Sequence, residues 1–333
     1  MKTQYVRELA EGTAVDSQFA LFSKEMRSTR SREAYLALEL GDRTGRIPAV
    51  CFRPSSEAIA LPSGGVIRVC GVVTTYRGTK RVSAERIEPA SSYDPQDFIE
   101  SSTRDPEEMV AEFKALAATV RDRDLRRILK GVFGEREFFE QFARCPGARV
   151  GHHARLCGLL EHSIAVATVC RTVSGVYQGV DTDLLVTAAL LHDVGRVDEL
   201  TYQTAVDRTD EGRLLGHAVL SERRVRDAAV RVRPGASARL VTQLSHAVLS
   251  HHGGDCAGAH PRPSTFEALL LSHADALDVG ADGFLSSTDA ASRAQERWTR
   301  ADNMFHRPLR VPAGRCETEA PWPAADALCA LRA

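Results

Sequence analysis

The stretch DLLVTAALLHDVGRVDEL, residues 183–200, decides the fold of the larger part of the chain. Its leucines and alanines recur at helical spacing, which predicts a buried helix that begins near residue 181 and ends at Gly195. An imidazole and a carboxylate, His192 and Asp193, follow one another at the end of this helix. Burying such a pair is costly unless a partner neutralises and ligates it, and a divalent cation does both. For an isolated pair, the alternative is a helix cap with ordinary hydrogen bonds.

This pair is part of a larger set, because ten of the eleven histidines lie between His152 and His273. Several of them adjoin apolar helical runs, as does one further aspartate. The candidate metal ligands are His162, His192, Asp193, His217, His251 and Asp275. A set of His and Asp without Cys is typical of a catalytic site for Mn, Fe, Co or Zn, and not of a structural zinc site.

The order of these residues resembles the HD superfamily of metal-dependent phosphohydrolases. The matching segments are GLLEHS, ALLHDVGRVDEL, EGRLLGH, LSHHGG and HADALD. Together with the preceding part of the chain, they resemble the YhaM-type 3′-to-5′ exoribonucleases, in which an OB-fold nucleic-acid-binding domain is followed by an HD domain. The resemblance extends from about residue 5 to about residue 310.

The resemblance implies two divalent metal ions bridged by the two oxygens of Asp193. One ion would be held by His162, His192, Asp193 and Asp275, and the other by Asp193, His217 and His251. Manganese is the expected metal, with Co, Fe or Zn as alternatives. His252 is either a further ligand or a substrate contact. The family usually has Lys after its HDxG motif, so Arg196 is expected to act in catalysis by binding a phosphate.

Three further residues are assigned supporting roles. His152 and His153 are candidates for a further metal or substrate contact at the terminal phosphate, against the alternative of polar contacts at a helix N-terminus. Asp278 lies three residues after Asp275 on nearly the same helical face and is expected to orient a ligand. The sequence STFE, residues 264–267, predicts a capping box for this helix.

The first 92 residues have the pattern of a small all-β domain. Turn signals separate short alternating segments at 18–26, 34–40, 47–52, 66–76 and 81–87. Five strands in this length predict a closed barrel of the OB type. The run FSKEMRSTRSREAYLALELGDRTGRIPAVCF also resembles the OB domain of the exonuclease family.

Basic and aromatic side chains on these strands form the candidate nucleic-acid-binding face, because cations neutralise phosphates and aromatic rings stack on bases. The candidates are Lys24, Arg27, Arg30, Arg32, Tyr35, Phe52, Tyr76, Arg77, Lys80 and Arg81. The alternative for each is a solvated cation or a ring in the core. Single-stranded RNA is the expected partner, and single-stranded DNA is a further candidate.

The remaining organisation follows from composition. A polar segment at 93–108 predicts a linker, an all-α HD domain is expected at 109–311, and a C-terminal tail at 312–333. The net charge of −1 excludes a global basic field, so any binding surface must be local. Eight scattered cysteines without a CxxC pair, and an N-terminus without an apolar core, favour a cytoplasmic protein with no membrane partner.

The sequence pattern predicts a β-barrel followed by a helical, metal-binding domain. Together with the resemblance, it implies a multidomain hydrolase, an OB barrel followed by a helical HD domain, that trims single-stranded RNA from its 3′ end and releases nucleoside 5′-monophosphates. Two alternatives stay open. One is an HD phosphohydrolase that acts on a small nucleotide such as a cyclic dinucleotide, an alarmone or a dNTP. The other is a non-catalytic nucleic-acid-binding protein. A homo-oligomer is compatible with all three.

Overall fold

The computed structural model describes residues 2–29, 31–232, 235–253 and 261–312. The chain divides into two compact units, Met1–Gly280 and Ala281–Ala333, so the second unit begins within the last helix. Arg30 of the predicted binding face and the tail from residue 313 lie outside the described residues. The predicted domain boundaries at 92, 108 and 311 stay predictions.

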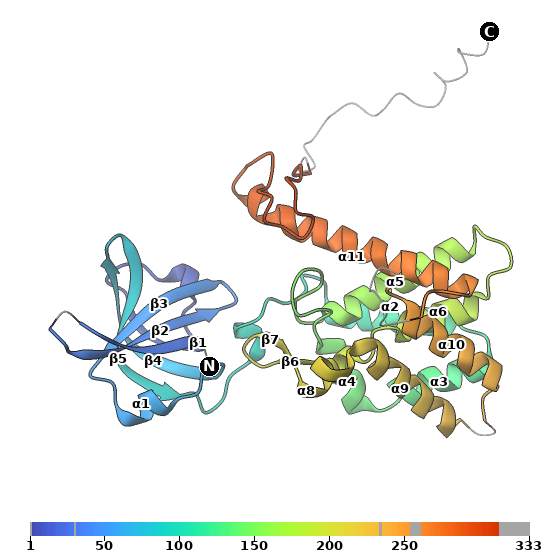
Figure 1. Cartoon of the computed structure of the whole chain (residues 1–333), viewed down its shortest axis with the longest axis horizontal. Coiled ribbons are helices and arrows are strands. Elements are labelled where there is room, and N and C mark those ends of the chain that lie inside the picture. The colour runs from blue at the N-terminus through green and yellow to red at the C-terminus, as the bar shows by residue number, and fades with distance from the viewer. Residues whose placement is uncertain (1, 30, 233–234, 254–260, 313–333) are drawn as a thin grey trace, which may run out of the picture. The chain divides into compact units, whose positions relative to one another are not determined.

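The N-terminal part is a closed five-stranded barrel with the strand order β1-β2-β3-β5-β4 (Figure 1). Its strands are β1 Ala14–Ser28, β2 Ala34–Asp42, β3 Gly45–Phe52, β4 Val66–Tyr76 and β5 Thr79–Pro89. The barrel closes because β1 pairs antiparallel with both β2 and β4, while β3 pairs parallel with β5. The predicted OB-type barrel is confirmed, with β1 longer than the sequence indicated.

Alternating apolar side chains fill the barrel, and Phe19, Val69 and Val82 are completely buried. At Gly71 the register between β4 and β5 shifts by a bulge. A Cβ at this position would lie 2.1 Å from the carbonyl oxygen of Ser83, so only glycine allows the two strands to approach here. A helix of five residues, α1 Ser56–Ala60, follows β3.

The C-terminal part is helical, as predicted. Its helices are α2 Pro106–Thr119, α3 Arg123–Phe133, α4 Arg136–Arg144, α5 Gly158–Ser174, α6 Thr182–Leu191, α7 Arg196–Glu199, α8 Asp210–Leu215, α9 His217–Arg231, α10 Ala238–Ser250 and α11 Phe266–Arg293. A short hairpin, β6 Leu200–Tyr202 and β7 Val206–Arg208, interrupts them. The prediction of an all-α domain did not include this hairpin. Its two strands have three residues each, too short for the period-2 pattern to show in the sequence.

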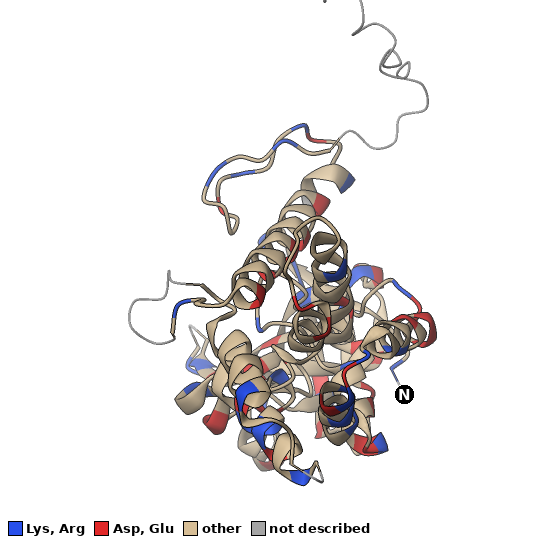
Figure 2. Ribbon diagram, turned by 90° about the vertical axis from the view of Figure 1, so that its right-hand side faces the viewer, with Lys and Arg blue, Asp and Glu red and all other residues tan. Residues whose placement is uncertain are grey.

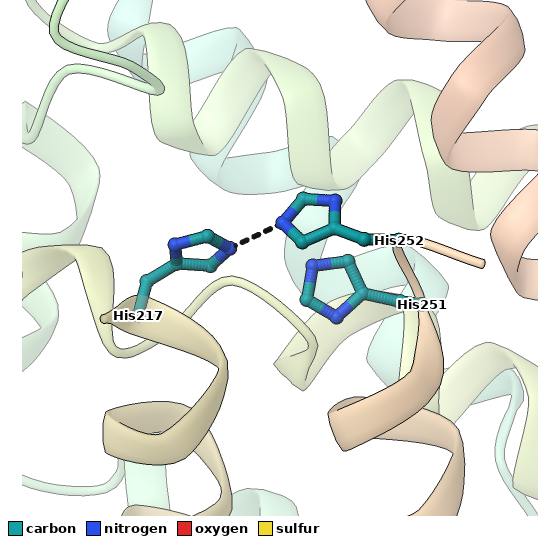
Figure 3. A group of neighbouring side chains, drawn as sticks. All are labelled: His217, His251 and His252. Carbon is teal, nitrogen blue, oxygen red and sulfur yellow. Dashed lines mark hydrogen bonds between the residues drawn. The ribbon is translucent and has the colours of Figure 1, made fainter. Parts of the chain in front are cut away.

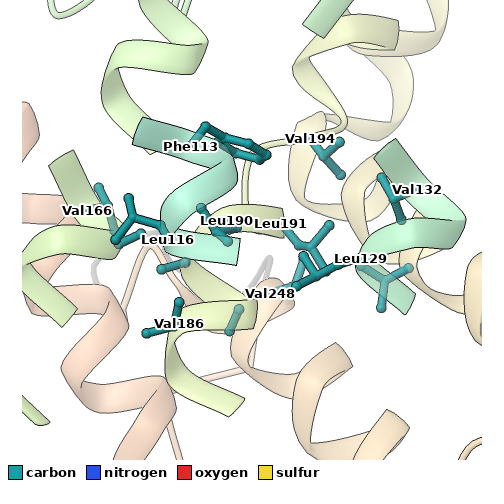
Figure 4. Packing of buried hydrophobic residues seen from close by; sticks show 14 of the residues in the cluster. Phe113, Leu116, Leu129, Val132, Val166, Val186, Leu190, Leu191, Val194 and Val248 are labelled. Carbon is teal, nitrogen blue, oxygen red and sulfur yellow. The ribbon is translucent and has the colours of Figure 1, made fainter. Parts of the chain in front are cut away.

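Helix α6 is the centre of this part, because every residue from Leu184 to Leu191 is buried. Helices α5, α3 and α10 pack against it. Figure 4 shows Leu190 and Leu191 among side chains from the surrounding helices, including Phe113 of α2 and Val248 of α10. The decisive stretch therefore folds as the buried helix that its periodicity predicts.

The end of α6 differs from the prediction. The helix ends at Leu191, and Gly195 belongs to the turn that precedes α7. A Cβ on Gly195 would lie 2.4 Å from the backbone nitrogen of Ser221 and 2.5 Å from the carbonyl oxygen of His217. Glycine is therefore required for the close approach of this turn to α9.

The predicted capping box of α11 is wrong in its register. Thr265 caps the helix, since its hydroxyl accepts a hydrogen bond from the backbone N–H of Ala268 at 3.2 Å. Glu267 instead accepts a hydrogen bond from the backbone N–H of Asp181 at 3.0 Å, immediately before α6. This contact between two distant segments holds α11 beside α6, which the local pattern could not indicate.

Basic and acidic residues are interspersed on the helices, as Figure 2 shows. This distribution agrees with the net charge of −1 of the chain. Among the described residues, no helix is both long enough and apolar enough to cross a membrane.

Candidate metal centre and nucleic-acid interface

A groove of about 700 Å³ on the barrel brings half of the predicted binding residues together. The predicted residues that line it are Arg27, Tyr35, Tyr76, Arg77 and Arg81. Tyr76 is 51% exposed, and the guanidinium carbon of Arg81 lies 4.5 Å from its ring centroid. Exposed rings beside cations are the features with which proteins bind single strands.

Three of the other predicted cations do not line the groove. The ammonium group of Lys24 donates to the carbonyl of Ile59, and that of Lys80 donates to the carbonyl of Leu9 at 3.3 Å. Arg32 has a left-handed backbone with φ of 63° and is exposed outside the groove. The sequence showed that these residues are basic, but their direction depends on the strand pairing and on the turn geometry.

Of two further residues in the groove region, the sequence analysis predicted one as a binding residue and missed the other. Phe52 does not line the groove, but its ring is 46% exposed and lies 5.4 Å from that of Tyr35. Arg46, which was not predicted, does line it and pairs with Glu39 at 3.2 Å. It lies two residues before the exposed Pro48, so the alternation of β3 was the signal that could have identified it.

The predicted metal ligands come from separate helices and meet at one place. His162 lies within α5, and His192 and Asp193 follow α6. The first residue of α9, the two residues after α10 and a residue of α11 supply the others, which are His217, His251, His252 and Asp275. All of them except His217 and His252 are at least 95% buried.

Asp193 lies between two groups of histidines. Its Oδ1 is 3.3 Å from His217 Nε2 and 3.5 Å from His251 Nε2. Its Oδ2 is 3.8 Å from His162 Nε2 and 4.0 Å from His192 Nε2. Each carboxylate oxygen therefore has its own pair of imidazole nitrogens.

Asp275 closes the site from α11. Its Oδ1 is 3.2 Å from His162 Nε2 and 3.8 Å from His192 Nε2, and its Oδ2 is 3.6 Å from His252 Nδ1. The Nε2 atoms of His162 and His192 face each other at 3.0 Å. The Nε2 atoms of these two buried rings therefore lie close to each other and to the carboxylates of Asp193 and Asp275, so that their lone pairs converge on one point.

Local hydrogen bonds fix which nitrogen each ring presents. His192 Nδ1 donates to the carbonyl of Ala189 at 2.8 Å, and His251 Nδ1 donates to the carbonyl of Val248 at 2.5 Å. Each ring follows the end of its helix, where unpaired carbonyls are available. Because Nδ1 carries the proton, Nε2 keeps its lone pair for a ligand.

For His162 and His217, a carboxylate instead of a backbone carbonyl lies next to Nδ1. Asp278 Oδ2 lies 2.7 Å from His162 Nδ1, and Glu199 Oε2 lies 3.3 Å from His217 Nδ1. Glu199 is 1% exposed and was not singled out in the sequence. All four rings thus present Nε2 to Asp193, with Nδ1 held by an acceptor on the far side.

The residues fit divalent cations. Asp193 Oδ1 and His251 Nε2 are buried without a hydrogen-bond partner, which is costly unless a cation completes them. Three groups have ligand atoms within 4.8 Å of one another: His162 with His192 and Asp193, His217 with His251 and His252, and His153 with His162 and Asp278. The donor set is imidazole and carboxylate, which suits Mn, Fe, Co or Zn.

The geometry agrees with comparisons to known families. The sequence pattern of the HD domain matches residues 159–280, the segment that contains His162, His192, Asp193 and Asp275. Residues 159–280 of the helical part form an HD domain region. The pattern described as an OB-fold nucleic acid binding domain matches residues 22–90, within the barrel.

Curated relatives match this chain over most of its length and most of their own. The chain is 28% identical to the 3′-5′ exoribonuclease YhaM of Halalkalibacterium halodurans over 80% of this chain and 84% of that protein. It is 27% identical to YhaM of Listeria monocytogenes serotype 4b over 90% of this chain and 96% of that protein. A solved structure, the second OB-fold domain of replication protein A from Methanococcus maripaludis, covers 28% of this chain and 99% of its own at 18% identity and a TM-score of 0.23, too low to support an argument.

The electrostatics of the HD domain suit metal ligands. Burial lowers the pKa of His192 to about 4 and that of His217 to about 3, so both are neutral near pH 7. Burial favours the neutral form of Asp193, but Arg196 and the neighbouring imidazoles hold its pKa well below the usual value. Hydrogen bonds from histidines likewise outweigh burial at Asp275, whose pKa is also well below the usual value. Both carboxylates are therefore ionised.

Arg196 lies within the HD domain and not at its surface, with 7% exposure. Its Nε is 3.2 Å from Asp193 Oδ2, and its Nη1 donates to Glu199 Oε2 at 2.7 Å. Glu199 also lies 3.3 Å from Arg208 and leaves no room for a side chain at Gly212. The guanidinium is thus held by two carboxylates of the protein.

His252 extends the second group of ligands. Figure 3 shows its ring and that of His217 directed at each other, with His251 beside them. The Nε2 atoms of His217 and His252 are 2.7 Å apart. The structure therefore brings His252 into the site, although its side chain is one-third exposed.

The two adjacent histidines before α5 differ in their surroundings. His153 is 3% exposed, and its Nε2 lies 2.8 Å from the same Asp278 oxygen that contacts His162. The ring of His152 is half-buried, with its centroid 6.2 Å from that of His162. Of the two, His152 is the one accessible to a substrate.

Proposed function

We propose that the chain is a metal-dependent 3′-to-5′ exoribonuclease that degrades single-stranded RNA, and single-stranded DNA as a second substrate, to nucleoside 5′-monophosphates. The convergence of four imidazole Nε2 atoms on the two oxygens of Asp193 carries this proposal. The presence of an OB fold before the HD domain and the names of the curated relatives support the substrate.

The ligand assignment follows the two oxygens of Asp193. The Oδ2 side, with His162, His192 and Asp275, is proposed to hold one cation. The Oδ1 side, with His217 and His251, is proposed to hold the other, and His252 is proposed to complete this second group or to contact the substrate. Manganese is the proposed metal, since imidazole with carboxylate accommodates it and the donor set contains no thiolate.

Two bound cations would activate water as a nucleophile and neutralise the charge that develops on the phosphoryl oxygens. The water oxygen bonds to phosphorus, and the bond from phosphorus to the 3′ oxygen of the penultimate nucleotide breaks. A nucleoside 5′-monophosphate leaves, and the shortened strand keeps a 3′-hydroxyl group. No Ser or Cys nucleophile is needed.

The protein's own residues position this reaction. Arg196 is proposed to fix Asp193 and balance its charge, because both carboxylates that hold it are buried with it. A direct phosphate contact is proposed instead for His152, which faces the site from its rim. The barrel groove would hold the strand through Arg27, Arg77 and Arg81.

A comparison of three substrates tests this function. The purified protein would be incubated with Mn²⁺ and a single-stranded RNA, a cyclic dinucleotide or a dNTP, and the products separated by anion exchange. Release of nucleoside 5′-monophosphates from RNA, at a rate far above that for the small nucleotides, is the expected result. Turnover of a small nucleotide with intact RNA would assign the site to that class of substrate, and no turnover of any would indicate a binding protein.

A further inference from the structure

The second compact unit contains a folded loop, residues 295–311, which we call the C-terminal loop. Its two ends are joined by a bridge between Trp298 and Arg310. The backbone N–H of Thr299 donates to the carbonyl of Leu309 at 2.9 Å, and that of Val311 donates to the carbonyl of Arg297 at 3.0 Å. The loop is therefore closed by main-chain hydrogen bonds and does not depend on side chains alone.

Asn303 fixes the interior of the C-terminal loop. Its amide nitrogen donates to the carbonyls of Arg300 and Arg307, each at 2.7 Å. Its side-chain oxygen accepts a hydrogen bond from the backbone N–H of Phe305 at 2.9 Å. One side chain thus connects both arms of the loop through their backbone.

Apolar contacts hold the loop on the last turns of α11. Leu309 is 4% exposed, and the rings of Phe305 and Phe284 lie 6.0 Å apart, nearly perpendicular. Met304 packs so closely on Gly283 that a Cβ there would collide with its sulfur. The outer surface of the loop is therefore presented from a packed base.

The outer surface combines one large ring with several cations. Trp298 is 56% exposed, an unusual position for a tryptophan in a packed loop. The arginines of the loop are Arg297, Arg300, Arg307 and Arg310, all of them exposed. The only acidic residues among residues 295–311 are Glu296 and Asp302. Asp302 lies 3.8 Å from Arg300, and with side-chain exposures of 76% and 88% this pair is weak.

We propose that the C-terminal loop is a second binding site for single-stranded RNA, separate from the groove on the barrel. An exposed indole offers a face on which any base can stack, and guanidinium groups neutralise phosphates without reading the sequence. A cleft of about 450 Å³ beside the loop has room for a nucleotide, and its lining includes Thr299, Arg300 and Asn303 together with the two acidic residues of the loop, Glu296 and Asp302. The inference rests on the proposed function, since it assigns a further contact to the same substrate.

Tryptophan fluorescence tests the site directly, because the chain has two tryptophans and Trp322→Phe leaves Trp298 as the only one. The full-length Trp322→Phe protein would be titrated with a 12-nucleotide oligoadenylate in EDTA, which prevents cleavage. Saturable quenching is expected, as stacking on a base quenches the indole. Unchanged fluorescence over a range in which anisotropy of a labelled oligoadenylate reports binding would overturn the proposal.

Affinities of variants complete the test. Trp298→Ala is expected to weaken oligoadenylate binding about 5-fold or more, whereas Leu285→Ala, an apolar side chain with 60% exposure on α11, should bind as the parent does. Replacing Arg300 and Arg307 by Gln should reduce the slope of log K against log salt by about 1.4, since each phosphate contact to a single strand contributes about 0.7. Arg293→Gln is the matched charge control, as its guanidinium is paired with Asp289.

The loop site and the proposed function can be refuted separately. If the Trp298 and arginine variants bind like the parent while substitutions in the barrel groove abolish binding, the loop site is wrong and the proposed function stands. If the parent itself does not bind oligoadenylate, both are wrong.

Discussion

Asp278→Ala is predicted to weaken metal binding at His162 while leaving the HD domain folded. Asp278 Oδ2 is 2.7 Å from His162 Nδ1 and 2.8 Å from His153 Nε2, so one oxygen orients two rings. Burial alone would lower the pKa of His162, but its contacts with the Asp275 and Asp278 carboxylates raise it to about 10, so these two carboxylates hold the ring strongly. Without Asp278, the ring is free to turn and its tautomer is no longer fixed.

The magnitude follows from the role of the carboxylate. Loss of a partner that orients a metal-ligating histidine typically costs about 10- to 100-fold in metal affinity or activity, or about 1.4–2.7 kcal/mol. Asp278→Asn keeps an acceptor but removes the charge, so it should fall between the parent and Asp278→Ala. The side chain is 15% exposed, which allows water to replace part of the lost contact and favours the lower end of the range.

Two measurements check this prediction. Competition with a chelating dye would give the affinity for Mn²⁺, and RNA cleavage would be titrated with Mn²⁺ for each variant. The half-saturating Mn²⁺ concentration should rise about 10-fold or more, and the rate at saturating metal should recover to near that of the parent. Asp289→Ala, an exposed carboxylate of the same helix, is the control. Parent-like affinity in Asp278→Ala, or a lost rate that added metal does not restore, would refute the positioning role.

Three further changes have distinct expected outcomes. Glu199→Gln removes the charge that holds a guanidinium and an imidazole of the centre, so metal affinity measured by dye competition should fall about 10-fold; an unchanged affinity would exclude this role. Phe113→Ala empties a site with 2% exposure in the helical core, and urea unfolding should show a loss of about 3–5 kcal/mol; a loss below about 1 kcal/mol would mean that the core is not packed as described. Replacing Arg27, Arg77 and Arg81 by Gln should reduce the salt slope of RNA binding by about 2 without changing metal content, and a parent-like slope would place the strand elsewhere.

The sequence was sufficient for the fold and for the His and Asp side chains that the structure brings together. The period-2 and helical patterns identified the five strands and α6 because each element buries one face, or all faces, in a core. The ligands could be found because they lie within or beside apolar helical runs, where an unpaired His or Asp would be costly. The resemblance to the HD superfamily then supplied the grouping that spacing alone could not give.

The supporting residues were harder to predict. Glu199 lies six residues after Asp193, across a turn, and its carboxylate reaches His217 because α7 packs against α9. The same limitation explains Thr265, whose hydroxyl caps α11, while the hydroxyl of Ser264 donates to the carbonyl of Arg262. Such contacts depend on side-chain directions that a one-dimensional pattern does not contain.

On the barrel surface, the sequence alone did not show which basic residues reach the groove. Lys24 and Lys80 were as basic in the sequence as Arg81, but both contact backbone carbonyls outside the groove. Arg46 was passed over and lines it. A shift of one residue along a strand reverses the face on which a side chain lies, so the strand register decides which cations reach the ligand.

The most direct test of the central claim is a time course on 5′-labelled single-stranded RNA, resolved by length, with Mn²⁺ or with EDTA. The account predicts a ladder that shortens from the 3′ end with Mn²⁺, intact RNA with EDTA, and no ladder for Asp193→Ala at any metal concentration, because both groups of ligands depend on this carboxylate. Asp193→Ala should still bind RNA. Intact RNA in every lane, or more than a few per cent of parent turnover in Asp193→Ala, would contradict it.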